Sequence, residues 1–249
     1  MKLKKLVCLV LITVTGCMLL SGCGNNNAAS KDKYGIITSS DAQAEQIKKK
    51  MKVEDKKEVA DMTFYLGTMK DQNVVLVKNE IGKVNTATAT QILLDKFGAT
   101  KIIEANTFVS LKEECKEGSI LVATETIQSD FDATGAGYAP AEIPATGLGA
   151  FATDVELHKM ALDVAKKTAS ADNVFEVSVC SGDKYELTND EIDKIVKDHD
   201  GDVYDMDSAA LGQVCYLNGI PYIIVGSVST PDAPADATAE IVEKIVGTD

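Results

Sequence analysis

The fold is decided by residues 221–227, Pro-Tyr-Ile-Ile-Val-Gly-Ser, in which apolar residues follow one another almost without interruption. A run of this length and composition, opened by proline, predicts a strand that is buried on both faces. After a short segment rich in Pro, Ala and Asp, residues 235–246 show the spacing of a helix. A buried strand followed by a helix indicates a sheet whose faces are covered by helices.

The same alternation extends back toward the start of the chain. We expect strands at residues 34–37, 63–69, 73–78, 101–104, 119–123, 174–179 and 202–205, and helices at 41–51, 82–97, 153–167, 188–197 and 208–217. The strands at 63–69 and 73–78 are separated by only three residues, which predicts a hairpin. The pattern predicts an α/β protein of three layers, with helices on both sides of a central mixed, mainly parallel sheet.

Residues 130–149 interrupt this alternation, because glycines and prolines punctuate the segment. A segment of this length without a helical or strand pattern is uncommon in a compact domain, and such loops are usually functional. We therefore expect a long functional loop between a strand and the helix at 153–167.

The N-terminal residues have the pattern of a secretory signal, with lysines before a mostly apolar stretch at 6–20. Leu20-Ser21-Gly22-Cys23 follows and resembles the bacterial lipobox, which implies that Cys23 is acylated and holds a secreted lipoprotein to the outside of the cell membrane or to the outer membrane. We assign 1–22 to the signal peptide, 23–33 to the lipidated cysteine and a polar tether, and 34–249 to the folded domain. A plain transmembrane anchor is the alternative, but the apolar stretch is short for the ~20 residues of a span.

The charge and cysteine content exclude several classes of partner. The chain has 25 basic and 38 acidic residues and a net charge of −13, and it contains no arginine. Such an acidic surface argues against nucleic acid and anionic lipid headgroups as partners. Cys115, Cys180 and Cys215 follow the lipobox, and their spacing fits no zinc site. The sequence also has no dinucleotide-binding or phosphate-binding glycine motif, so we expect no metal and no cofactor.

Several short motifs occur in a fixed order: Gly35-Ile36-Ile37, Tyr65-Leu66-Gly67, Val74-Val75-Leu76-Val77, Ile81-Gly82-Lys83-Val84, Ser181-Gly182-Asp183 and Tyr204-Asp205-Met206-Asp207. In this order they resemble the 5′-methylthioadenosine/S-adenosylhomocysteine nucleosidases of the nucleoside phosphorylase superfamily, over about residues 34–246. The resemblance implies a nucleoside phosphorylase-like fold and hydrolysis of an N-glycosidic bond that releases adenine. It also implies a homodimer in which a neighbouring chain completes the pocket.

Cleavage of an N-glycosidic bond needs a carboxylate that grips the ribose hydroxyls, a base that activates water and an acid that protonates the leaving purine. The resemblance places Asp207 at the ribose-binding position, where the family has Glu, and Met206 under the sugar. Asp is one methylene shorter, so its carboxylate would reach less far or act through water. The alternative is that Asp205 and Asp207 only cap the following helix.

The two proton-transfer positions differ from the family pattern. The water-activating Glu is replaced by Gln43, which can hold water but cannot take its proton. The leaving-group acid is replaced by Thr230, a hydroxyl that cannot protonate a purine usefully near neutral pH. Asp232, two residues further on, would substitute for that acid only if its loop were displaced.

The resemblance also implies which residues line the ligand pocket. Ile81, Thr107 and Ser229 fall at ligand-contacting positions, and Phe108 stands where the family has a glycine-rich turn, so its ring should narrow the wall. Tyr185 follows the Ser-Gly-Asp motif at the position of a purine-stacking aromatic; the alternative is a half-buried sheet residue. Phosphorolysis is disfavoured, because phosphate is usually held by Arg.

These observations predict a membrane-anchored lipoprotein whose purine-nucleosidase-like domain is catalytically degenerate and binds a nucleoside-like or other small ligand. The first alternative is an active methylthioadenosine/S-adenosylhomocysteine nucleosidase that uses Asp207 with unusual helpers such as Asp232. The second is a purely structural surface protein whose pocket is closed by Phe108.

Overall fold

The computed structural model describes residues 32–228 and 235–248. Cys23 and residues 1–22 lie outside the described residues, as do Ser229, Thr230 and Asp232. The helices are α2 (Asp41–Lys50), α3 (Lys83–Asp95), α4 (Val155–Thr168), α5 (Asn189–His199), α6 (Ser208–Asn218) and α7 (Ala235–Val246), with 3₁₀ turns η1 (Thr134–Ala136) and η2 (Ala171–Asn173). The strands are β1 (Lys33–Thr38), β2 (Lys52–Val59), β3 (Met62–Met69), β4 (Gln72–Lys78), β5 (Lys101–Ser110), β6 (Ile120–Gln128), β7 (Phe151–Ala152), β8 (Val174–Ser181), β9 (Val203–Asp205) and β10 (Tyr222–Val228).

The strands form one mixed sheet in the order β10-β6-β8-β9-β5-β1-β4-β3-β2, and β7 pairs with β6. The central pairings β4–β1, β1–β5, β5–β10, β6–β8 and β8–β9 are parallel. Because β10 pairs with both β5 and β6, the strands β5, β10, β6, β8 and β9 close into a ring. The predicted nucleoside phosphorylase-like α/β architecture is confirmed.

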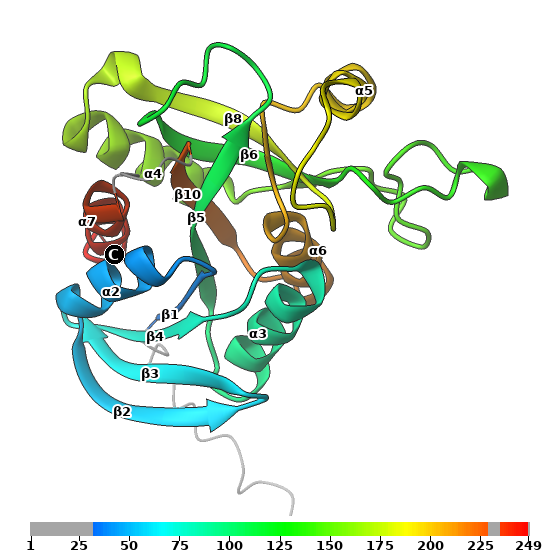
Figure 1. Ribbon diagram of the computed structural model, residues 1–249. Coiled ribbons are helices and arrows are strands. Elements are labelled where there is room, and N and C mark those ends of the chain that lie inside the picture. The colour runs from blue at the N-terminus through cyan, green and yellow to red at the C-terminus, as the bar shows by residue number, and fades with distance from the viewer. Residues whose placement is uncertain (1–31, 229–234, 249) are drawn as a thin grey trace, which may run out of the picture. The chain divides into compact units, whose positions relative to one another are not determined.

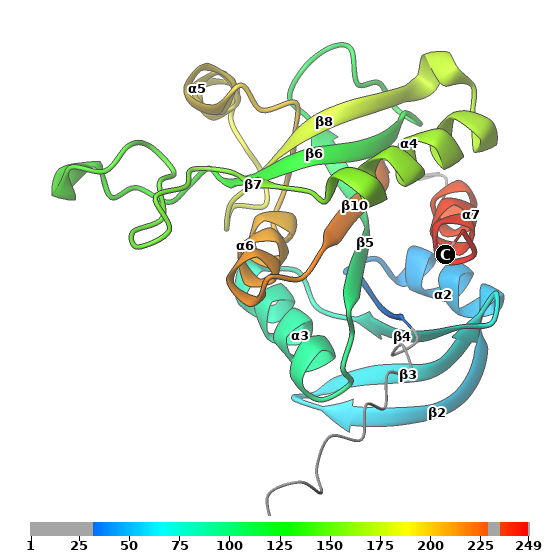
Figure 2. The ribbon, with the colours of Figure 1, turned by 180° about the vertical axis from the view of Figure 1, so that it is seen from behind.

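Helices cover both faces of this sheet, as Figures 1 and 2 show. Helices α2, α4 and α7 pack together on one face, and α3 and α6 pack on the other. Ile47, Leu157 and Ile241 lie in the core of the first face, and Leu93 and Leu211 lie in that of the second. All five side chains are at most 3% exposed, and each buried side chain of this size contributes roughly 1.5–3 kcal/mol.

Local sequence signals place most elements within two or three residues. The predicted 63–69 and 73–78 hairpin is the antiparallel pair β3–β4, and the predicted helix at 235–246 is α7. Ser40 caps α2 through Gln43 N, and Thr188 and Glu191 form a capping box at the start of α5. These signals lie in neighbouring residues, so the elements could be predicted without knowing which helices or strands pack against them.

Four strands differ from the sequence-based expectation. The short strand β7 was not predicted, and β6 continues to Gln128 and does not end at 123, because its second half pairs with β8. Lys52–Val59 was not predicted as a strand, because all of its residues except Val53 and Val59 are charged. In the structure it is almost wholly exposed and pairs with β3 as the edge strand β2. Charged side chains are typical of an edge strand, where they hinder further pairing. Strand β5 continues to Ser110 and does not end at 104, because its second half pairs with β10 and β9.

The segment between β6 and β7 is the predicted long loop. It contains η1 and an isolated bridge between Ile143 and Leu148, and both ribbon views show it extending well away from the body of the domain.

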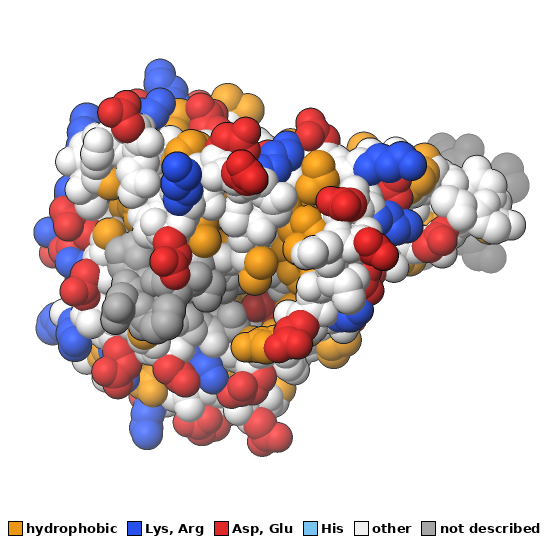
Figure 3. Space-filling model, turned by 45° about the horizontal axis from the view of Figure 1, so that its top comes forward, with side chains coloured by type: hydrophobic (Ala, Val, Ile, Leu, Met, Phe, Trp, Pro, Cys, Tyr) orange, Lys and Arg blue, Asp and Glu red, His pale blue; other side chains and the backbone are white. Residues whose placement is uncertain are grey.

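Lysines and acidic side chains are interspersed over the face shown in Figure 3, with hydrophobic side chains exposed between them. Within the described residues, none of the helices combines the length and hydropathy needed to cross a bilayer.

Candidate functional site

A cavity of about 360 Å³ lies where the end of β5 meets β9 and the start of α6. Its walls are formed by Ser39, Ile81, Asn106, Thr107, Phe108, Val109, Tyr185, Glu186, Tyr204, Asp205, Met206 and Asp207. The cavity therefore brings together all the predicted ligand-contacting residues except Ser229, which lies outside the described part of the chain. Its volume is near the lower end of the range that small-molecule sites occupy.

Asp207 is buried at the floor of this cavity and holds the start of α3. Its Oδ1 accepts a hydrogen bond of 2.7 Å from Gly82 N and one of 3.2 Å from the Thr86 hydroxyl. Gly82 has a φ of 119°, which a side chain rarely allows, so glycine permits this approach of its N–H. A carboxylate at a helix N-terminus is stabilised by the free N–H groups there. Within the described residues these bonds use Oδ1, which leaves Oδ2 for a ligand hydroxyl.

Asp205 caps the helix that follows it, α6, which was the alternative role expected for both Asp205 and Asp207. Its carboxylate accepts hydrogen bonds from Ser208 N and Oγ at the start of α6, from the Ser181 hydroxyl and from Asn106 Nδ2. The side chain of Asp207 makes no capping bond to α6. The helix-capping alternative is therefore correct for Asp205 and wrong for Asp207. Burial, and then the charge of Asp207, raise the pKa of Asp205 above its ordinary value.

Gln43 is 1% exposed and does not line the cavity. Its Nε2 donates to the main-chain oxygen of Asn106 at 2.9 Å, and its Oε1 lies 3.5 Å from the Thr38 hydroxyl. The side chain therefore ties α2 to β5 and β1. A carboxylate in the same orientation would place an acceptor against the Asn106 carbonyl, so the amide suits this contact and glutamate does not.

Phe108 forms part of the wall without filling the cavity. The ring is 1% exposed and packs in the core beneath α6. A Cβ on Gly226 would lie 2.7 Å from Phe108 Cε2 and 2.1 Å from the Asn106 carbonyl oxygen. Glycine in β10 therefore makes room for Phe108, and closure of the cavity by this ring is not observed.

Tyr185 lies at the rim of the cavity and is 75% exposed, so the half-buried sheet alternative for this residue is wrong. The hydroxyl of Tyr204 lies 2.9 Å from the main-chain oxygens of both Gly182 and Lys184, which share its one proton, and so fixes the turn that carries Tyr185. A largely exposed ring over a cavity can gain buried area when a ligand enters.

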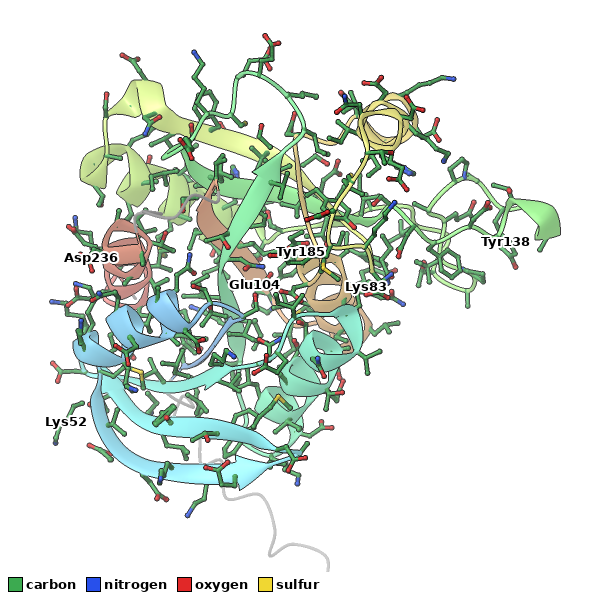
Figure 4. The ribbon with its side chains drawn as sticks, in the orientation of Figure 1. Lys52, Lys83, Glu104, Tyr138, Tyr185 and Asp236 are labelled. Atoms are coloured by element: carbon green, nitrogen blue, oxygen red, sulfur yellow. The ribbon has the colours of Figure 1, made fainter. Side chains whose placement is uncertain are left out.

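Ion pairs fix the base of the long loop beside the cavity. Lys83 Nζ at the start of α3 lies 2.6 Å from Asp130 Oδ1 and 3.7 Å from Asp183 Oδ2. Asp130 also accepts a hydrogen bond of 2.9 Å from Asp183 N. Figure 4 shows Lys83 at the body of the domain, whereas Tyr138 lies at the outer end of the loop.

Glu104 is a carboxyl group that the sequence reasoning did not single out. It is 1% exposed on β5, and Figure 4 places it in the interior of the domain. Its Oε2 has no hydrogen-bond partner within the described residues. Burial, followed by the charges of Asp205 and Asp207, raises the pKa of Glu104 well above its ordinary value. The available signal was an acidic residue at the end of the apolar run at 101–104.

Other parts of the described surface fit the predicted chemistry less well. A larger hollow of about 610 Å³ lies between α2 and the β3–β4 hairpin, but none of the predicted ligand contacts lines it. Among the residues that the structure describes, no group of three or more His, Cys, Asp or Glu side chains is placed to hold a metal ion.

The contacts of Asp207 predict a specific pattern of stability. Asp207→Ala should lower the free energy of unfolding by ~1–3 kcal/mol, because Gly82 N–H and the Thr86 hydroxyl lose their acceptor in a buried place. Asp207→Asn keeps an acceptor oxygen and should lose less. Urea unfolding measures both changes, with Asp163→Ala on the exposed side of α4 as control. Equal stability of wild type and Asp207→Ala would contradict the anchoring role.

Comparisons with known proteins agree with this architecture. The phosphorylase superfamily profile matches residues 33–247. A 5′-methylthioadenosine/S-adenosylhomocysteine nucleosidase from Buchnera aphidicola is 30% identical over 216 residues, which cover 86% of this chain and 90% of the relative. One from an Exiguobacterium species is 29% identical over 198 residues, covering 79% and 84%.

Solved structures show the same fold. The nucleosidase from Neisseria meningitidis, in complex with methylthio-immucillin-A, is 26% identical with a TM-score of 0.81, covering 87% of this chain and 99% of that one. A futalosine hydrolase from Helicobacter pylori has a TM-score of 0.79 at 21% identity, covering 87% and 97%, which shows the fold alone. The chain therefore belongs to the phosphorylase superfamily and, within it, to the 5′-methylthioadenosine/S-adenosylhomocysteine nucleosidase family.

Proposed function

We propose that this protein is a membrane-anchored lipoprotein whose domain binds a nucleoside-like or other small ligand without turning it over. The observation that carries the proposal is the contrast between Asp207 and Gln43. Asp207 faces the cavity with a carboxylate oxygen that no described residue engages, whereas Gln43 is buried and its amide donates to Asn106. The site therefore keeps a group that can bind hydroxyls and lacks the base that would activate water.

The missing proton transfers account for the proposed lack of turnover. A positioned general acid or base typically contributes 10²–10⁴-fold to the rate. Gln43 cannot act as a base, and Thr230 in the acid position cannot protonate a purine usefully near neutral pH. Loss of both roles would leave binding and orientation as the main properties of the site.

The composition of the cavity supports a neutral, hydroxyl-bearing ligand. Its lining contains Glu186, Asp205 and Asp207 and no lysine, and the chain has no arginine. A phosphate group would meet negative charge without a basic partner. Asp207 suits the vicinal hydroxyls of a ribose, and Tyr185 at the rim suits a flat base. Nucleosides such as 5′-methylthioadenosine, which the names of the relatives mention, combine these features.

A binding and turnover measurement tests this proposal. Saturating 5′-methylthioadenosine should raise the melting temperature of the purified protein, since ligand at 100 times Kd adds ~2.7 kcal/mol. Chromatography should detect no adenine released above the rate without protein. Asp207→Asn should lose the thermal shift and Asp163→Ala should keep it. Adenine release at an ordinary enzymatic rate that Asp207→Ala abolishes would establish the active alternative and contradict degeneracy.

The proposed anchor has its own test in the cell. Cys23→Ala in the full chain should remove the acylation site and move the protein from the membrane fraction to the soluble fraction. Val14-Thr15-Gly16-Cys17 resembles the lipobox more weakly, so Cys17→Ala should leave the protein in the membrane fraction. Fractionation with metabolic labelling by a fatty acid measures both. A Cys23→Ala protein that remains membrane-bound would show that another segment anchors the chain.

We also propose a homodimer formed through the face of α3 and α6. Val84 on α3 is 77% exposed and Leu217 on α6 is 63% exposed. Both line a mainly apolar hollow of about 350 Å³ between the two helices. Exposed apolar patches of this kind are typical of protein interfaces. The long loop leaves the body of the domain on the side of α6 in both ribbon views, so a second copy on this face would lie beside it.

Sedimentation velocity tests this interface. The wild-type protein should sediment as a dimer, and Leu217→Lys should shift it toward the monomer, because a charge would replace apolar contact area. Val155→Lys is the matched control, since Val155 is 81% exposed on α4, which covers the opposite face of the sheet. A monomeric wild type, or equal dissociation by both substitutions, would contradict the proposed interface.

A further inference from the structure

Three carboxyl groups lie together at the cavity, on β5, on β9 and just before α6; those of Asp205 and Asp207 line it, and that of Glu104 does not. Glu104, Asp205 and Asp207 are each at most 7% exposed. The Nδ2 of Asn106 lies 3.5 Å from Glu104 Oε1 and 3.0 Å from Asp205 Oδ2, so it stands between the two side chains. Among the described residues, the charges that shift the pKa of Glu104 are those of Asp205 and Asp207, and no lysine is among them. The cluster therefore has to be balanced by hydrogen-bond donors or by a proton.

The donors are shared very unequally among the three groups. Asp205 accepts from the hydroxyls of Ser181 and Ser208, from main-chain N–H groups of the 207–208 segment and from Asn106. Asp207 accepts from Gly82 N and the Thr86 hydroxyl. Glu104 has the long contact from Asn106 and the hydroxyl of Ser208, which also donates to Asp205, and its Oε2 has no partner within the described residues. A buried carboxylate is stabilised by donors, so the proton of the cluster should reside on the group with the fewest.

We propose that Glu104 is a neutral carboxylic acid in the folded protein and acts as a positioning residue for Asp207, so that loss of its proton weakens ligand binding. Its uncharged form leaves Asp205 and Asp207 as the only negative charges of the cluster, each at a helix N-terminus. Ionised Glu104 would add a third charge whose donors, Asn106 and the Ser208 hydroxyl, are shared with Asp205, and it would disturb the geometry of Asp207. The binding half of this inference rests on the proposed function, but the protonation of Glu104 does not.

The surroundings of Glu104 are consistent with this state. Burial is the main cause that raises its pKa, and the charges of Asp205 and Asp207 act in the same direction. Among the described residues, Glu104 also influences the pKa of Cys215 on α6 and of Tyr222 on β10. Burial raises the pKa of that thiol and of that phenol, so both are uncharged near neutral pH.

Unfolding as a function of pH tests the protonation without any ligand. Unfolded Glu104 loses its proton near its ordinary pKa of 4.5, whereas the folded group keeps it to higher pH. The wild type should therefore lose stability relative to Glu104→Gln, a permanently neutral variant of similar shape, as pH rises above that value. The melting temperatures of the two proteins should differ little near pH 4.5 and diverge toward pH 8. Glu45→Gln, at an exposed position of α2, controls for the removal of a surface charge.

Calorimetric titration with 5′-methylthioadenosine tests the positioning role. The affinity of the wild type should fall by up to about tenfold per pH unit once Glu104 ionises, because only the neutral form is competent. Glu104→Gln should bind with a similar affinity at neutral pH and should lack this pH dependence. An identical pH dependence in both proteins would overturn the positioning role.

The outcomes separate the two halves of the proposal. A stability difference between Glu104→Gln and the wild type that is the same at every pH would show that the pKa of Glu104 is equal in the folded and unfolded states, and this overturns the protonation. Absence of 5′-methylthioadenosine binding at all pH values would overturn the positioning role together with the proposed function. The unfolding measurement would still decide the state of Glu104 in that case.

Discussion

The site depends on carboxylates held at the N-termini of two helices. Asp205 accepts from the first residue of α6, and Asp207 accepts from the residue that precedes α3. Among the described residues, main-chain N–H groups, hydroxyls and the amide of Asn106 donate to these carboxylates, and no basic side chain does. The two contacts also fix α3 and α6 against the ends of β5 and β9. The contacts that anchor α3 and α6 therefore also set the positions of Asp205 and Asp207 in the wall of the cavity.

This constraint affects how Asp207 can be interpreted. An aspartate that anchors α3 would be favoured for stability even in a protein that binds nothing. The property that points to a ligand is the orientation of the group, which lines the cavity and is engaged through one oxygen by the described residues. Gln43 shows the opposite case, because its whole amide is committed to contacts within the fold.

Much of the fold could be predicted from the sequence because the signals were local. The apolar run of β10, the spacing of α7 and the capping box of α5 depend on neighbouring residues alone. Strand β2 could not be predicted, since its charged residues adopt a strand only because β3 provides the hydrogen-bond partner. The second half of β5 similarly depends on pairing with β10 and β9, which are distant in sequence.

The residues that line the candidate site could be predicted where the order of the sequence motifs matched the order in the family. Positions such as Met206 and Tyr185 followed from the resemblance, and the structure places both on one cavity. The donors to Asp207, the contact of Gln43 with Asn106 and the isolation of Glu104 could not be inferred, because each joins segments far apart in sequence. A single acidic residue in an apolar strand gives no indication of whether it will carry a proton.

The central claim is that the family fold persists here with a hydroxyl-binding carboxylate and without the groups that transfer protons. A crystal structure of the protein grown with 5′-methylthioadenosine tests it most directly. The account predicts an intact nucleoside in the cavity, with a ribose hydroxyl on Asp207 Oδ2 and the base beside Tyr185. Free adenine in the cavity, or a nucleoside bound elsewhere with Asp207 unengaged, would contradict it.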